Sequence, residues 1–74
     1  MNKARRQKIS NTIKTLQQVL DNLSSILLEE EIAHDSMPEN LQYSIKGEES
    51  EEAINIISES IDILHDVCGN LESI

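Results

Sequence analysis

The sequence has few features, other than apolar packing, that hold a small protein together. Its 74 residues include no tryptophan or phenylalanine, one tyrosine, one proline, two glycines and one cysteine. A single cysteine excludes an internal disulfide, and no group of cysteines and histidines has the spacing of a zinc site. Because a chain this short buries only about 60% of its unfolded surface, we expect a second chain to supply the missing burial.

Long apolar runs are also absent. No uninterrupted apolar run reaches 7 residues, and Asn11, Lys14 and Gln17 interrupt the segment that follows the basic start. This pattern excludes a membrane-spanning helix and a secretory signal peptide. We therefore expect a cytoplasmic protein with no membrane partner.

Cations are almost absent after residue 14. Residues 1–14 carry five cations and no acid, whereas residues 15–74 carry all 14 acids and only one cation, Lys46, so the net charge is −8. An acidic surface disfavours direct binding of nucleic acid, since neutralisation of phosphates dominates that affinity. The acidic part of the chain is better suited to a basic protein surface, including mimicry of the charge of a nucleic acid.

Two segments show the heptad spacing of packed helices. The apolar residues of the first are spaced 4-3-4-3-4 and alternate between heptad positions d and a: Ile9, Ile13, Leu16, Leu20, Leu23 and Leu27. Those of the second are spaced 3-4-3-4-3 and begin at position a: Ile54, Ile57, Ile61, Leu64, Cys68 and Leu71. These twelve residues, the seam, predict an all-α fold with helices over about residues 4–33 and 48–72.

An antiparallel hairpin of the two helices resolves an electrostatic conflict. The first helix begins with four cations, which oppose the positive end of its own macrodipole, and the hairpin brings them beside the C-terminal end of the second helix. In this arrangement we expect Leu16 to face Val67. Leu20 then faces Asp62 or Ile61.

Additional apolar residues lie beside the seam, at the neighbouring heptad positions g and c. On the second helix, positions c, g, d and a together cover about 160° of the helical wheel, which is more than one partner helix covers. We therefore expect a dimer that forms a four-helix bundle. The residues expected at this interface are Val19, Ile26, Ile56, Ile63 and Val67.

The elbow between the helices, residues 34–47, is longer than a minimal helix–helix turn. Ser36 and Glu39 have the spacing of a capping box, with Pro38 tolerated between them, and predict a short helical turn. Four apolar residues lie in or beside this turn: Met37, Leu41, Tyr43 and Ile45. They either fill the open end of the hairpin or form a recognition loop.

The residues capable of chemistry do not form an active site. Glu31 and His34, like Asp62 and His65, have the spacing of metal-binding carboxylate–histidine pairs, but the hairpin separates the two histidines by about 26 Å. Cys68 occupies a seam position, where a cysteine acts as a small apolar residue. We therefore expect no metal, no cofactor and no enzymatic activity.

The two charged segments each allow more than one interpretation. The basic start, Lys3–Lys8, either pairs with the end of the second helix, docks on an acidic partner or makes weak phosphate contacts, and it has no aromatic side chain to stack on a base. The acidic run Glu48–Glu52 is either a solvated helix start or a mimic of nucleic-acid charge.

Three segments resemble a known group of proteins: the start Ala4–Ile9, the elbow Asp35–Gln42 and the segment Gly47–Ile54. The group comprises small acidic helical-hairpin proteins of bacteriophages and prophages, mostly of Gram-positive bacteria, which have no assigned function. The chain departs from the group at His34, where an aromatic residue is usual, and at Lys46, where arginine is usual. The resemblance implies a bacterial host cell and transfers no site residues.

Association with phage proteins favours a non-enzymatic protein-binding module, an inhibitor or adaptor that docks on a basic surface of a host or defence protein. A nucleic-acid enzyme such as a CRISPR nuclease is one such target. The alternative is a structural homo-oligomeric phage protein with no inhibitory role. A small-ligand carrier is disfavoured because the seam has almost no polar residue. The expected partner-binding residues are Met37, Glu39, Asn40, Tyr43, Glu48, Glu49, Glu51, Glu52, Arg5 and Arg6.

Overall fold

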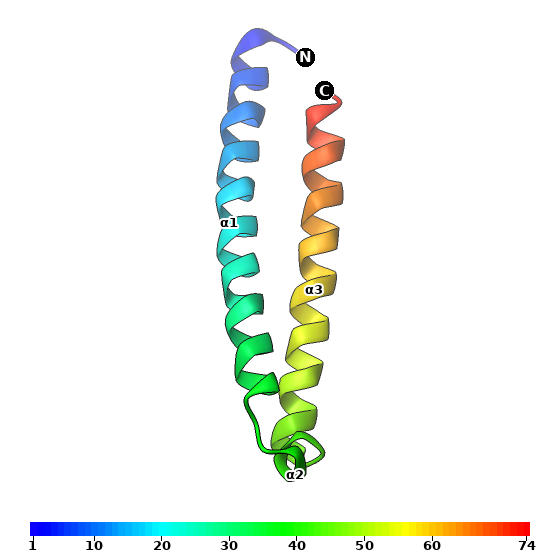
Figure 1. Ribbon diagram of the computed structural model, residues 1–74. Helices are drawn as coiled ribbons and strands as arrows, with labels where there is room; N and C mark the ends of the chain where they lie inside the picture. Colours follow the sequence, from blue (N-terminus) through cyan, green and yellow to red (C-terminus); the bar gives the residue numbers. More distant parts are fainter.

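The computed structural model describes residues 1–74 and contains only helices (Figure 1). Helix α1 spans Lys3–Asp35, α2 spans Glu39–Gln42 and α3 spans Ile45–Glu72. The two long helices lie side by side and antiparallel, with both termini at one end and α2 at the other. The predicted all-α hairpin with a short helical turn at its elbow is confirmed.

The molecule is a single pair of helices. Its principal extents are 58 × 15 × 13 Å and its radius of gyration is 17.0 Å, whereas a compact chain of this length has a radius of gyration of about 11 Å. No third helix covers either side of the pair. Most of the surface of each long helix therefore faces solvent.

The predicted seam is the interior of the hairpin. All twelve of its residues are buried or half-buried, but only Leu20 and Cys68 reach full burial, each with 6% of its surface exposed. Each seam residue contacts one neighbouring helix and has solvent on both flanks. The heptad spacing thus identified the contact line correctly, and the shape of the molecule limits how much apolar surface it buries.

One side-chain hydrogen bond fixes how the long helices align. The buried Ser50 hydroxyl donates to the carboxylate of Glu30 at 2.7 Å, and both residues occupy d positions beyond the last apolar pair. Two heptads away, Leu16 is therefore level with Leu64, and the expected partner Val67 lies about one turn further on. The connection is also shorter than expected, because α1 continues to Asp35 and α3 begins at Ile45.

The same alignment places Leu20 level with Ile61, one of the two partners predicted for it. Leu20 is one of the two fully buried apolar residues. The middle of the seam is therefore its best-covered part.

The helix ends are capped by residues other than the predicted ones. The Asn2 side chain accepts a hydrogen bond from the Arg5 N–H at 2.9 Å and caps α1, and Ser44 is the N-cap of α3. The predicted capping box at Ser36 is wrong. Ser36 ends α1 as its C-cap and donates its N–H to the Ile32 carbonyl at 3.0 Å, whereas the N-cap of α2 is Pro38, without a side-chain capping hydrogen bond.

Gln42 holds the elbow against the end of α1. Its Nε2 donates to the carbonyl of His34 at 3.4 Å and to that of Met37 at 3.2 Å. Both carbonyls lie at or just beyond the end of α1, and the His34 carbonyl also accepts the backbone N–H of Met37 at 3.1 Å. A side chain from α2 therefore ties the elbow to the end of α1 with two further hydrogen bonds.

Gly47 allows the backbone of α2 to pack directly on α3. The residue is buried in the first turn of α3, and a Cβ atom there would overlap the carbonyl oxygens of Leu41 and Gln42. Gly69, in the last part of the same helix, has open space around it. A methyl group would therefore overlap backbone atoms at Gly47 and meet no neighbouring atom at Gly69.

We expect Gly47→Ala to lower the free energy of unfolding by about 1–3 kcal/mol, because backbone must move to admit the methyl group. Gly69→Ala, the matched control, should raise it by about 0.5–1 kcal/mol, because alanine is the better helix former. Urea unfolding followed by circular dichroism measures both values. Equal effects of the two substitutions would show that α2 does not press on Gly47.

Candidate docking surfaces

One side of the hairpin carries a cluster of exposed apolar side chains. In an antiparallel pair the g positions of the two helices lie on the same side of the seam, and the c positions lie next to them, further from the contact line. Here these positions bring together the residues predicted for a dimer interface, which we call the apolar face: Val19 and Ile26 of α1 with Ile56, Ile63 and Val67 of α3. All five are exposed, from 37% for Val67 to 62% for Ile63.

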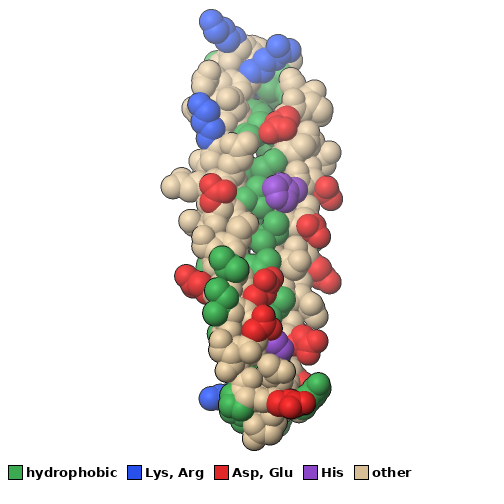
Figure 2. Space-filling model, in the orientation of Figure 1, with side chains coloured by type: hydrophobic (Ala, Val, Ile, Leu, Met, Phe, Trp, Pro, Cys, Tyr) green, Lys and Arg blue, Asp and Glu red, His purple; other side chains and the backbone are tan.

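The opposite side of the seam is polar. The e positions there carry Ser10, Gln17 and Ser24 from α1 and Ser58 and His65 from α3. In Figure 2 the seam appears as a green strip between polar and acidic side chains. The apolar face therefore lies on one side of the seam only and does not continue onto the e positions.

The elbow end of the hairpin carries exposed acids. Glu48, Glu49, Glu51 and Glu52 are all exposed at the outward positions of α3, and no lysine or arginine side chain donates a hydrogen bond in the structure. Figure 2 shows acids along α3 and at the elbow, with most cations at the other end. These four glutamates give the start of α3 a cluster of exposed negative charges.

Apolar side chains project beside these acids. Tyr43 is 80% exposed, Ile45 is 75% exposed and Leu41 is also exposed, whereas Met37 is half-buried. The expectation that these residues fill the open end of the hairpin is therefore wrong for Tyr43 and Ile45. At the elbow itself the backbone of α2 packs directly on Gly47 of α3.

The alternative, an elbow that offers a recognition surface, agrees with these exposures. We call this surface the acidic tip, and the exposed residues Glu39 and Asn40 of α2 adjoin it. Its members are Leu41, Tyr43, Ile45, Glu48, Glu49, Glu51 and Glu52.

The basic start of α1 makes no pairing with the end of α3. Arg5, Arg6 and Lys8 are exposed, and none of them donates a side-chain hydrogen bond. Of the three interpretations of this segment, internal pairing is thus absent from the structure. The five cations of this end are free to contact another molecule.

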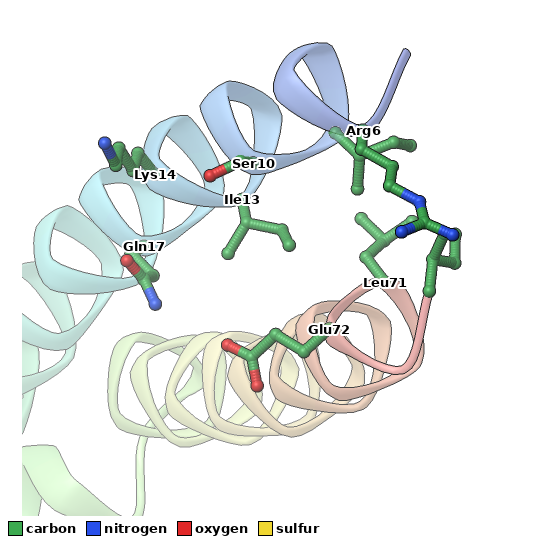
Figure 3. A pocket seen from close by; sticks show the side chains of 9 residues that line it. Arg6, Ser10, Ile13, Lys14, Gln17, Leu71 and Glu72 are labelled. Carbon is green, nitrogen blue, oxygen red and sulfur yellow. The ribbon is translucent and has the colours of Figure 1, made fainter. Parts of the chain in front are cut away.

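The open end of the hairpin contains a hollow of about 380 Å³ that the sequence did not indicate. Figure 3 shows Ile13 and Leu71 pointing into the space between the helices, with the Glu72 carboxylate beside them, while Lys14 points away from α3. The hollow forms where the seam runs out near the chain ends. Its mixed lining of apolar, basic and acidic groups does not select one kind of ligand.

A second feature that sequence reasoning missed is a pair of exposed apolar residues on the outer side of α1. Leu28 and Ile32 are 58% and 57% exposed and lie four residues apart, so they are neighbours on the helix surface. They occupy b and f positions, away from both the seam and the apolar face. Their four-residue spacing was the available signal, and it was masked by the stronger heptad pattern around it.

The structure brings no three side chains of histidine, cysteine, aspartate or glutamate into positions that could hold a metal ion. Cys68 is a free thiol buried in the seam, and the buried Nδ1 of His34 has no hydrogen-bond partner. Neither long helix contains a stretch that is apolar enough to cross a bilayer.

Comparison of the chain with protein-family models, with curated proteins and with solved structures found no match.

We expect Tyr43→Ser and Ile45→Ser each to change the free energy of unfolding by less than about 0.5 kcal/mol, because these exposed side chains contribute little to packing. Leu20→Ala, a control in the middle of the seam, should cost about 2–5 kcal/mol. Thermal and urea unfolding of the three variants checks this. A large loss of stability for either tip variant would show that the side chain packs inside the elbow.

Proposed function

We propose that this chain is a non-enzymatic protein-binding module that dimerises into a four-helix bundle and docks through its acidic tip on a basic surface of a larger protein. The observation that carries the proposal is the combination, at one end of the molecule, of exposed Tyr43 and Ile45 with four glutamates that have no cationic partner. An isolated solvated helix start accounts for the glutamates but not for the apolar side chains among them.

This combination resembles the composition of protein–protein interfaces. Aromatic side chains are enriched at the centre of such interfaces, and charged groups around them set the orientation of the partner. A cluster of carboxylates also attracts a basic surface over a distance and raises the rate of association. The tip therefore has both an apolar anchor and a steering charge for a basic partner.

The partner class rests on the resemblance of Ala4–Ile9, Asp35–Gln42 and Gly47–Ile54 to small acidic phage proteins. Such proteins act in the cytoplasm of a bacterial host, where a basic groove that binds nucleic acid is the natural complement of clustered carboxylates. We therefore propose an inhibitor or adaptor directed at a host or defence protein, including nucleic-acid enzymes such as CRISPR nucleases.

The apolar face supports dimerisation. The chain exposes 5640 Å² of surface, whereas a compact monomer of 8.4 kDa exposes roughly 4,600 Å². The excess of about 1,000 Å² is comparable with the roughly 800 Å² that each partner buries in a standard interface. Stacking two hairpins through their apolar faces would remove this excess and give each seam residue a second layer of neighbours.

The apolar face by itself favours the second candidate, a structural homo-oligomeric phage protein with no inhibitory role. A structural protein needs the dimer interface but has no use for an exposed aromatic among carboxylates. Co-purification of the protein with phage particles, without a host protein bound, would support this candidate.

We expect Ile63→Asp to abolish the dimer, because two aspartates would be buried in the interface without partners. The matched control is Leu28→Asp, since Leu28 is similarly exposed at 58% but lies outside the apolar face. Sedimentation velocity over a range of concentrations measures the oligomeric state, and circular dichroism confirms that both variants stay helical. An unchanged dimer with Ile63→Asp would place the interface elsewhere.

We expect neutralisation of the four tip glutamates, Glu48, Glu49, Glu51 and Glu52, to glutamine to abolish capture of a basic host protein. The control neutralises four acids nearer the other end of α3, Glu59, Asp62, Asp66 and Glu72, and changes the net charge equally. Each tagged protein is incubated with lysate of its bacterial host, at low and at high salt, and bound proteins are identified by mass spectrometry.

The expected result is one basic protein that the unchanged chain and the control variant retain at low salt, that the tip variant loses, and that high salt releases. Equal loss with both variants would show that net charge, and not the acidic tip, determines binding. Recovery of the chain alone would favour the structural homo-oligomer.

A further inference from the structure

We propose that the two hairpins of the dimer run antiparallel, so that the basic start of each chain lies beside the acidic elbow end of the other. The inference rests on the dimer proposed above and concerns its orientation. It also assigns the cations of residues 1–14, which find no partner within the chain, to contacts with a second copy.

The apolar face lies near the middle of the hairpin. Val19 and Ile63 are almost level with each other, and the remaining members of the face lie on either side of them along the 58 Å length. A twofold axis that crosses the hairpin near this level superposes the apolar faces of two antiparallel copies, and a twofold axis along the hairpin superposes those of two parallel copies. Apolar contacts alone therefore do not determine the orientation.

The two orientations differ in which helices stack. In a dimer whose twofold axis runs along the hairpin, α1 of one copy stacks on α3 of the other and both elbows lie at one end. In a dimer whose axis runs across the hairpin, α1 stacks on the partner's α1, α3 stacks on the partner's α3, and the elbows lie at opposite ends. Neighbouring helices are antiparallel in both, so helix dipoles do not discriminate between them.

The charged residues beside the apolar face do discriminate. Three of them occupy exposed c positions, the same positions as Ile56 and Ile63: Lys8 and Glu29 on α1 and Glu49 on α3. In the parallel dimer Glu29 comes within one helical turn of the partner's Glu49, and the twofold axis repeats this like-charge contact. Lys8 then faces only the uncharged Asn70 of the partner.

In the antiparallel dimer Lys8 comes within one helical turn of the partner's Glu29, and the axis repeats this pairing of opposite charges. Glu49 then lies beside the partner's Asn70 and meets no acid. The antiparallel orientation therefore replaces two repulsive contacts with two attractive ones at the edge of the same apolar interface.

The distribution of charge along the whole chain also distinguishes the two orientations of the dimer. Residues 1–14 carry five cations and no acid, whereas the elbow end carries nine acids, Glu29–Glu31, Asp35, Glu39 and Glu48–Glu52, with Lys46 as the only cation. The parallel dimer places the two acidic ends together, while the antiparallel dimer places each against a basic end. Long-range electrostatics thus favours the same arrangement as the local contacts.

The test uses Glu29→Lys, because its effect has opposite signs in the two orientations. In the antiparallel dimer the substituted side chain meets the partner's Lys8 with like charge, which should weaken dimerisation roughly 5- to 50-fold at low salt. In the parallel dimer the substitution removes a repulsion from the partner's Glu49 and should strengthen dimerisation. Both Lys8 and Glu29 are exposed, so variants at these positions should stay folded.

The double variant Lys8→Glu with Glu29→Lys exchanges the two charges and should restore the dissociation constant to within about twofold, because the pair is re-formed. Sedimentation equilibrium measures the dissociation constants of the unchanged chain, of each single variant and of the double variant. A Glu29→Lys variant that dimerises as well as or better than the unchanged chain, or a double variant that is not rescued, overturns the antiparallel arrangement.

A distance measurement gives an independent answer. A spin label on Tyr43→Cys, in a chain whose buried Cys68 is replaced by alanine, reports the separation of the two elbows. The antiparallel dimer should give a distance approaching the 58 Å length of the hairpin, and the parallel dimer one within roughly 30 Å, because neighbouring helix axes lie about 8–10 Å apart. The short distance overturns the orientation alone, whereas a chain that stays monomeric at all concentrations overturns the dimer itself.

Discussion

The single line of contact between α1 and α3 determines the rest of this structure. Two helices that touch along one seam bury only the residues at positions a and d, and even there most side chains remain partly exposed. Apolar burial is the main favourable term in folding, and here it is limited by the absence of a third helix. The apolar residues at positions g and c therefore remain exposed in the monomer, and only a second chain would bury them.

The seam was predictable because heptad spacing is a local property of the sequence, repeated along the length of each helix. The elbow was not, because its structure depends on contacts between residues that no spacing connects: Gln42 with the end of α1, and Gly47 with the backbone of α2. Ser36 has the sequence of a helix start, but α1 reaches it first and uses it as an end. Among the candidate site residues, the 80% exposure of Tyr43 is a property of the folded elbow that composition does not reveal.

Charged and apolar side chains occupy different parts of the molecular surface. Cations gather near the chain ends and acids gather toward the elbow. Exposed apolar side chains form the apolar face beside the seam, with further ones at the elbow and on the outer side of α1. An antiparallel pair of such hairpins would neutralise part of each acidic end with the partner's cations and still present an acidic tip at both ends. Such a molecule has two identical binding ends, so a target with two sites or two copies of a target would be bound with increased avidity.

The single elbow also affects the order in which contacts form during folding and break during unfolding. Residues near the elbow that meet across the seam are separated by short stretches of chain, whereas Ile9 and Leu71 are separated by almost the whole sequence. Because the entropic cost of closing a loop grows with its length, we expect the helices to come together from the elbow toward the termini. Amide hydrogens should therefore exchange most slowly in the middle of the seam and near Gly47, and fastest around the hollow at the open end, where the last contacts form and the first ones break.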